Sequence, residues 1–175
     1  MGTDPSRRRA LALVAGSGAA GALGAVAVVS ARLASAPAGS AASERPWVPV
    51  ARFPDLVDGH PVRVTVIADQ HDGYTTARAQ PLGLVWLVRA GDQVRAFSAA
   101  CPHLGCTVDL APGGAQFFCP CHSSSFELDG KKSAGKPNKS LRGLDALPAR
   151  VTADRAVEVQ FVRFLAGGPT AEELG

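Results

Sequence analysis

The sequence predicts an all-β head of antiparallel strands preceded by one transmembrane helix, and three observations favour this architecture. After Trp47 the chain consists of short apolar or alternating runs separated by turn residues, a pattern typical of antiparallel strands. Beyond residue 44 no stretch shows a long helical period of apolar side chains. Residues 10–31 carry no charge, and a helix of that length could cross the apolar core of a bilayer.

The length and the charge distribution narrow the class of protein. A chain of 175 residues fits one ordinary domain with a tail. The formal charge is +3, but four of the 18 basic residues lie before residue 34, and from Glu44 onward basic and acidic residues are equal in number. A neutral body lacks the basic surface that nucleic-acid binding requires, so we expect no nucleic-acid partner.

The N-terminal residues read as a membrane anchor. Residues 1–9 are predicted to form a cytoplasmic N-terminus in which Ser6-Arg7-Arg8-Arg9-Ala10-Leu11 resembles a twin-arginine export signal. Residues 10–33 are the predicted transmembrane anchor, and the basic residues before it place that end in the cytoplasm. A small-residue cleavage site is followed directly by Pro37, which disfavours cutting. We therefore expect an uncleaved single-pass anchor, with a removed signal peptide as the alternative.

A linker and a head follow the anchor. Residues 34–46 are the predicted flexible hinge, because the stretch from Ser35 to Ser43 contains only small residues that build almost no core. Such a linker could let a head swing through at most about 30 Å. Residues 47–175 are the predicted head domain.

Within the head, two hairpins are predicted from alternation and turn residues. One consists of strands at 84–89 and 93–97 joined at Ala90-Gly91-Asp92, with a further strand at 63–68. The other consists of strands at 147–152 and 156–162. His60 and His71 lie in turn-like segments, and we expect them to be exposed and uninvolved in function.

All four cysteines and two of the four histidines fall in two Pro/Gly-rich loops where the strand signals stop: Cys101-Pro102-His103-Leu104-Gly105-Cys106 and Cys119-Pro120-Cys121-His122-Ser123-Ser124-Ser125-Phe126. Thiolates with imidazoles select zinc, copper or iron–sulfur centres. The residues alone leave three interpretations open: an iron–sulfur centre, a closed zinc site of two Cys and two His, or two plain disulfides. Zinc leaves two cysteines unexplained in an exported chain, and disulfides leave both histidines without a role.

The two loops resemble the boxes C-T-H-L-G-C and C-P-C-H-G-S of Rieske iron–sulfur proteins, and the likeness extends from about Trp47 to the C-terminus. The resemblance implies a Rieske-type antiparallel β-sandwich head with a small cluster-binding subdomain at about 99–140 and one [2Fe-2S] cluster. Two imidazole ligands raise the potential of such a cluster above that of all-cysteine clusters. The implied positions are Cys101 and Cys119 on one iron, His103 and His122 on the other, and Cys106 with Cys121 in a disulfide.

Within this family, the whole chain resembles the iron–sulfur subunit of a bacterial cytochrome bc-type quinol:cytochrome c oxidoreductase. Rieske domains of ring-hydroxylating oxygenases generally lack the extra cysteine pair and are cytoplasmic, which argues against that class. The resemblance implies electron transfer from a membrane quinol to a c-type cytochrome, with a cytochrome b-type subunit as partner. It also implies a dimeric, multi-subunit complex in the bacterial inner membrane, with the head on the periplasmic side. The alternative is the Rieske small subunit of an exported arsenite oxidase-like enzyme, to which the tail 161–168 has less resemblance.

The resemblance assigns roles to individual loop residues. His103 or His122 is expected to accept a hydrogen bond from the quinol and take up its proton, which makes these two histidines the candidate catalytic residues. Leu104 and Pro120 correspond to apolar residues at the loop tips that shield the cluster and dock in the quinol pocket. Gly105 is expected to permit either a close backbone approach or a positive φ beside the cluster.

Several residues near the second loop match or depart from the family pattern, and two of these positions affect the reduction potential of the cluster. Ser124 matches a serine whose hydroxyl donates to a bridging sulfide, whereas Phe126 stands where high-potential members carry a tyrosine. One expected hydrogen bond is therefore absent, which favours a low-potential donor such as menaquinol. Ser123 replaces a usual glycine. In the third loop, commonly Gly-Pro-Ala-Pro, residues 135–139 read Gly-Lys-Pro-Asn-Lys.

Overall fold

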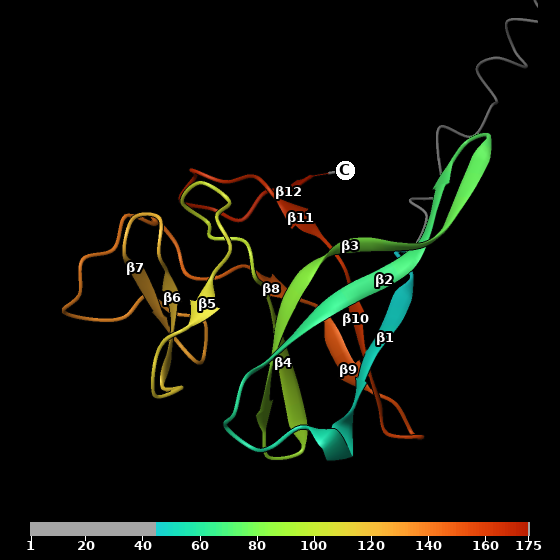
Figure 1. Ribbon diagram of the computed structural model, residues 1–175, viewed down its shortest axis with the longest axis horizontal. Coiled ribbons are helices and arrows are strands. Elements are labelled where there is room, and N and C mark those ends of the chain that lie inside the picture. The colour runs from blue at the N-terminus through green and yellow to red at the C-terminus, as the bar shows by residue number, and fades with distance from the viewer. Residues whose placement is uncertain (1–44, 175) are drawn as a thin grey trace, which may run out of the picture. The chain divides into compact units, whose positions relative to one another are not determined.

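The computed structural model describes residues 45–174, which form an all-β head (Figure 1). The elements in chain order are β1 (Trp47–Arg52), the 3-10 helix η1 (Phe53–Asp55), β2 (Val62–Asp72), β3 (Thr75–Ala90), β4 (Gln93–Ser98), β5 (Asp109–Leu110), β6 (Gln116–Cys119), β7 (Ser124–Glu127), β8 (Ala146–Leu147), β9 (Ala149–Val151), β10 (Ala156–Gln160), β11 (Arg163–Phe164) and β12 (Glu173–Leu174). The predicted all-β, antiparallel class is confirmed for this part of the chain.

The predicted anchor at 10–33 lies outside the described residues, as does the hinge apart from its last two residues. Between residues 45 and 174 the structure has no helix of the length and apolarity that a membrane crossing requires.

Two antiparallel sheets enclose the larger core. One has the strand order β1-β10-β9 and the other β2-β3-β4-β8. Apolar and polar residues alternate along β10, so one face of the strand lies in the core. Val157 and Val159 are fully buried, whereas Glu158 between them points to the partly exposed side. Val66 and Val85 bury the facing side of the second sheet.

A third sheet, β5-β6-β7, forms a separate lobe that stands beside the larger sheets in Figure 1. It has its own aromatic core, in which the ring of Phe117 lies 5.2 Å from Trp86 and 6.4 Å from Phe97 between centroids. Phe126 is fully buried in the same cluster. Since Trp86 and Phe97 belong to β3 and β4, this core fixes the small lobe to the larger sheets.

The predicted strands at 63–68, 84–89 and 93–97 are found, and the one at 156–162 is found as far as Gln160. The strand predicted at 147–152 is instead divided at Pro148 into β8 and β9. β2 and β3 continue well beyond their predicted ends. They form a hairpin that projects from the body in Figure 1 and whose residues 69–79 are exposed. Its turn is held by Asp72, whose carboxylate accepts a hydrogen bond from the Thr75 N–H at 3.0 Å. The prediction of a turn around His71 is wrong because His71 lies in β2, although it is exposed as expected.

The prediction that strand structure stops between residues 101 and 126 is also wrong. β5, β6 and the start of β7 lie in this stretch, and β6 pairs with β7 from Gln116 opposite Glu127 to Cys119 opposite Ser124. The second cysteine loop is therefore the connection of a hairpin, and the pairing of its two strands holds both ends of the loop.

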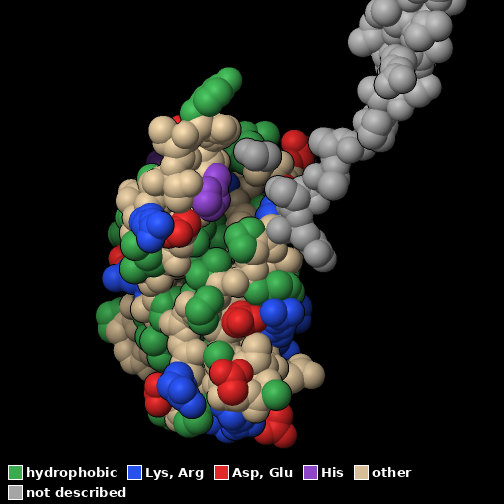
Figure 2. Space-filling model, turned by 90° about the vertical axis from the view of Figure 1, so that its right-hand side faces the viewer, with side chains coloured by type: hydrophobic (Ala, Val, Ile, Leu, Met, Phe, Trp, Pro, Cys, Tyr) green, Lys and Arg blue, Asp and Glu red, His purple; other side chains and the backbone are tan. Residues whose placement is uncertain are grey.

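Charges of both signs are distributed over the surface of the head. On the face shown in Figure 2, Lys and Arg side chains alternate with Asp and Glu and form no single basic patch. Ion pairs join Arg45 to Glu173 and Arg150 to Glu158, each at 2.6 Å. These exposed pairs add little stability on their own.

Candidate metal centre

The first cysteine loop follows β4 and closes on itself. The N–H of Cys101 donates to the carbonyl of Cys106 at 2.7 Å, and the N–H of Gly105 donates to the carbonyl of Cys101 at 2.8 Å. Gly105 has a φ of +77°, which is one of the two alternatives expected for it, and this conformation favours glycine. The loop buries Cys101, leaves His103 half-buried and exposes 62% of Leu104.

The second loop connects β6 to β7. It buries Cys119 at the end of β6, whereas Pro120, Cys121 and His122 are exposed. Ser123 adopts a φ of +56°. This left-handed conformation gives a physical reason for the glycine that the family usually has at this position.

The structure brings the predicted residues of both loops together. Cys106 and Cys121 form a disulfide with 6.6 Å between their Cα atoms. The rings of His103 and His122 lie 4.7 Å apart between centroids and are nearly perpendicular. Cys101 and Cys119 are free and buried. The sulfur of Cys119 lies within 4.8 Å of both sulfurs of the disulfide, so the disulfide lies directly beside one of the free thiols.

Burial is the main influence on the pKa of the Cys101 thiol. It raises the pKa of Cys101 to about 11, with a smaller upward contribution from the neighbouring Cys119, while the backbone N–H groups of His103 and Leu104 act in the opposite direction. A thiol with this pKa keeps its proton at neutral pH unless a metal displaces it. The same two N–H groups are placed to stabilise negative charge on the sulfur.

Ser124 and Phe126 lie in β7 directly behind the second loop, and both are fully buried. The hydroxyl oxygen of Ser124 accepts a hydrogen bond from the N–H of Lys139 at 3.1 Å, so its own proton remains available to a second acceptor. Next to it, the Asn138 side-chain amide donates to the carbonyl of Ser125 at 2.6 Å. The third loop thus contacts the second one although it lacks the usual Gly-Pro-Ala-Pro sequence.

Two residues that support the site were missed by the sequence reasoning. The Trp86 indole N–H donates to the buried carbonyl of Val108 at 2.9 Å, just beyond the first loop. Arg142 lies buried against Asp145 and reaches the C-terminal segment. The buried strand 84–89 around Trp86 was a usable signal, but an Arg and an Asp in an irregular segment give no sequence signal.

A comparison with protein-family models decides the family. Residues 46–147 match the model described as "Rieske [2Fe-2S] domain". The chain belongs to this family. Its cofactor is one Rieske [2Fe-2S] cluster, and the donors gathered here fit that group, because two buried free thiols and two adjacent imidazoles remain once the disulfide has taken the other cysteines.

Curated relatives share the central part of the chain. The menaquinol:cytochrome c reductase iron-sulfur subunit of Bacillus subtilis (strain 168) is 42% identical over 55 residues, which cover 30% of this chain and 33% of the relative. The cytochrome b6-f complex iron-sulfur subunit of Chlorobaculum thiosulfatiphilum is 41% identical over 73 residues, which cover 42% of this chain and 39% of the relative. The match thus spans less than half the length of either relative.

Among solved structures, the ferredoxin of carbazole 1,9a-dioxygenase from Nocardioides aromaticivorans IC177 aligns with a TM-score of 0.41 and 24% identity. This alignment covers 65% of the present chain and 95% of the ferredoxin.

Proposed function

We propose that this chain carries electrons from a membrane quinol to a c-type cytochrome, as the iron–sulfur subunit of a quinol:cytochrome c oxidoreductase. The observation that carries the proposal is the pair of adjacent imidazoles, His103 and His122, on two loops that a disulfide ties together and that each also bury one free thiol. The names of both curated relatives, a menaquinol:cytochrome c reductase subunit and a b6-f complex subunit, support it.

The ligands follow from the same arrangement. We assign Cys101 and Cys119 to one iron and His103 and His122 to the other, because these four side chains are the thiols and imidazoles left free in the two loops. When bound, the cluster accepts and releases single electrons at a potential that the imidazole ligands raise. The backbone N–H groups beside Cys101 favour the more negative, reduced form.

The exposed end of the site is suited to a quinol. His122 is exposed and His103 is half-buried, so a ring nitrogen at this end can accept a hydrogen bond from a quinol hydroxyl and hold its proton. Leu104, which is 62% exposed at the tip of the first loop, offers apolar surface to the pocket that holds the quinol. We place that pocket in a cytochrome b-type partner subunit.

We place the head on the periplasmic side of the bacterial inner membrane. A disulfide persists in oxidising compartments and is rare in the cytoplasm, and Cys106 and Cys121 form one here. The uncharged residues 10–31 would provide the single-pass anchor, and the small residues before Glu44 the hinge. The complex we expect is dimeric and contains several subunits.

We propose menaquinol as the donor. The phenyl ring of Phe126 is fully buried in β7 and has no hydroxyl to donate toward a ligand sulfur. Absence of that hydrogen bond lowers the potential of a cluster, which suits a low-potential quinol. The Bacillus subtilis relative is named for menaquinol, which supports the same choice.

The test is to isolate the full-length chain from its native membranes under mild detergent. We expect a b-type haem to co-purify, and we expect menaquinol to reduce the iron–sulfur centre within this complex. Leu104→Asp should slow that reduction while the iron content stays unchanged, because the charge would face the apolar pocket. Ile67→Asp is the matched control, since Ile67 is also exposed, at 52%, but lies on the β2–β3 hairpin. A molybdenum subunit in place of the b-type haem would refute the proposal and favour the arsenite oxidase-like alternative.

A further inference from the structure

Arg142 is a buried arginine in the irregular segment before β8. Its side chain is 8% exposed, and that of its partner Asp145 is 4% exposed. Nε donates to one carboxylate oxygen at 2.7 Å and Nη2 donates to the other at 2.8 Å. The pair is therefore a bidentate one, and Asp145 raises the pKa of the guanidinium. Asp145 is itself fixed, because its carbonyl accepts from the N–H of Ser98 at the end of β4.

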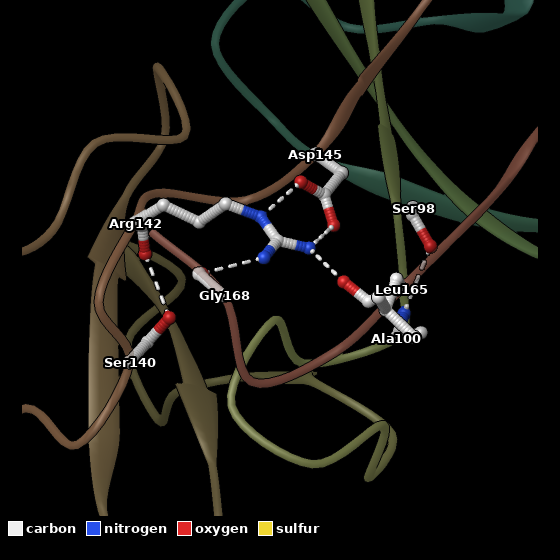
Figure 3. Close-up of polar contacts among 7 residues, drawn as sticks. All are labelled: Ser98, Ala100, Ser140, Arg142, Asp145, Leu165 and Gly168. Atoms are coloured by element: carbon white, nitrogen blue, oxygen red, sulfur yellow. Dashed lines mark hydrogen bonds and ion pairs between the residues drawn. The ribbon is translucent and has the colours of Figure 1, made fainter. Parts of the chain in front are cut away.

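The remaining donors of Arg142 bind the C-terminal segment. Nη1 donates to the carbonyl of Gly168 at 2.7 Å and Nη2 donates to that of Leu165 at 2.8 Å. Figure 3 shows the guanidinium between Asp145 on one side and these two carbonyls on the other. A lysine has no planar fork of donors and could not make all four bonds at once.

The C-terminal segment in turn contacts the first cysteine loop. The N–H of Gly167 donates to the carbonyl of Pro102 at 2.9 Å. At Gly167, where φ is +91°, a Cβ would lie 3.8 Å from the carbonyl oxygen of His103. The C-terminal segment therefore lies against the backbone of the two residues that follow Cys101, between Arg142 and the site.

Arg142 is also connected to the second loop. Its carbonyl accepts from the Ser140 hydroxyl at 2.7 Å, and the N–H of Ser140 donates to the side chain of Asn138, whose amide binds Ser125. The guanidinium of Arg142 thus reaches the C-terminal segment, whereas its backbone carbonyl connects it through Ser140 to the third loop and to the second cysteine loop.

We propose that Arg142 and Asp145 are a positioning pair, which holds residues 165–168 against the first cysteine loop and thereby fixes the backbone of Pro102 and His103 beside Cys101. The proposal deepens the proposed function, because it rests on Cys101 and His103 being cluster ligands. A buried network of this kind also stabilises the fold, so the test must measure the loop itself.

The first measurement is hydrogen exchange of the peptide covering 101–106 in the full-length, cluster-free chain. In Arg142→Gln we expect exchange to be at least about tenfold faster than in the wild type, because an uncompensated Asp145 and two lost carbonyl bonds release the C-terminal segment. Arg142→Lys should not restore slow exchange. Arg150→Gln is the control, since it also removes an arginine from an ion pair, but in the β9–β10 sheet. It should leave the loop unchanged.

Two further variants keep the test decisive. Arg142→Gln with Asp145→Asn leaves no unpaired buried charge, so it should fold even if the single variant fails to fold, and it should show the same fast exchange. A chain that ends after Ala166 keeps the Arg142–Asp145 ion pair but loses Gly167 and Gly168 together with β12, and it should have the same effect on the loop. Combining this truncation with Arg142→Gln should raise the exchange rate of the loop little further, because both changes act through the contact between the C-terminal segment and the first cysteine loop.

The second measurement is the midpoint potential of the cluster-loaded chain. Arg142→Gln should lower the midpoint relative to Arg150→Gln, because a loosened loop would move away the backbone N–H groups of His103 and Leu104, which favour negative charge on the Cys101 sulfur. Wild-type exchange rates in the double variant, or normal loop exchange in the truncated chain, would overturn the proposal. A wild-type chain that binds no iron would instead refute the proposed function, and the exchange comparison would still decide whether the pair positions the loop.

Discussion

The rings of His103 and His122 lie edge to face with their centroids 4.7 Å apart, although they belong to different loops. The disulfide between Cys106 and Cys121 joins these loops across a sequence separation of 15 residues. Neither loop has a helix or a long strand within it to fix its shape. The histidine pair therefore depends on the closure of each loop and on this one covalent link.

Cys106→Ser should distinguish the role of the Cys106–Cys121 disulfide, which joins the loops, from the role of the residues that bind iron. Closing a loop of this length stabilises the folded state by about 3 kcal/mol in the chain-entropy model, so we expect a cluster that assembles but is lost more readily. Cys101→Ser and His122→Ala should lose the cluster, because each removes a ligand. The measurement is iron and acid-labile sulfide per chain, followed over time. Equal and complete loss of the cluster in all three variants would contradict this distinction between the disulfide and the iron ligands.

Phe126→Tyr should raise the midpoint potential. A hydroxyl that donates to a ligand sulfur stabilises the more negative, reduced cluster, and a net hydrogen bond of roughly 0.5–1.5 kcal/mol corresponds to about 20–65 mV for one electron. Ser124→Ala should lower the midpoint by a comparable amount, since the free proton of its hydroxyl is lost. Voltammetry on the purified chain measures both shifts.

Phe118→Tyr is the control for Phe126→Tyr, because Phe118 lies on the neighbouring strand and is only half-buried. It should leave the midpoint unchanged. If the hydroxyl of the Phe126→Tyr variant points at a ligand sulfur and the midpoint still does not move, the tuning argument fails. Menaquinol would then lose its physical support from this residue.

The sequence was sufficient for the parts of the site that depend on residue chemistry. Cysteine and histidine are scarce and their spacing is specific, so the two loops could be located without coordinates, whereas the cysteine pairing was implied only by the resemblance to Rieske proteins. The β2–β3 hairpin could not, because residues 69–79 are exposed on both faces and show no apolar alternation. Arg142 and Asp145 were missed for a related reason, since charged residues in an irregular segment give no sign that they are buried.

Trp86→Phe should destabilise the small lobe. The indole N–H donates to the buried carbonyl of Val108, and a buried carbonyl without a donor costs about 1–3 kcal/mol. Denaturant unfolding of the full-length chain measures the loss. Trp47→Phe is the control, because Trp47 is half-buried at the start of β1, and it should cost less. Equal losses would show that ring size, and not the hydrogen bond, decides stability here.

Gly143→Ala should destabilise the segment that carries Arg142. A Cβ at this position would lie 2.5 Å from the carbonyl oxygen of Gly130 and 3.4 Å from two further backbone atoms. That carbonyl already accepts from the N–H of Leu144 at 2.8 Å, so it cannot move away without breaking a hydrogen bond. Overpacking of this kind costs about 1–3 kcal/mol, and we expect that loss in denaturant unfolding.

Gly168→Ala is the matched control for Gly143→Ala. A Cβ there would meet its nearest atom, the carbonyl oxygen of Thr170, at 3.6 Å, which is an ordinary contact, and the Gly168 carbonyl that binds Arg142 is retained. Its free energy of unfolding should stay within about 0.5 kcal/mol of the wild type. If Gly143→Ala were equally mild, residues 130 and 143 would be able to separate at little cost. The close contact between these two glycines would then not be what holds the third loop in place for its hydrogen bonds to Ser124 and Ser125.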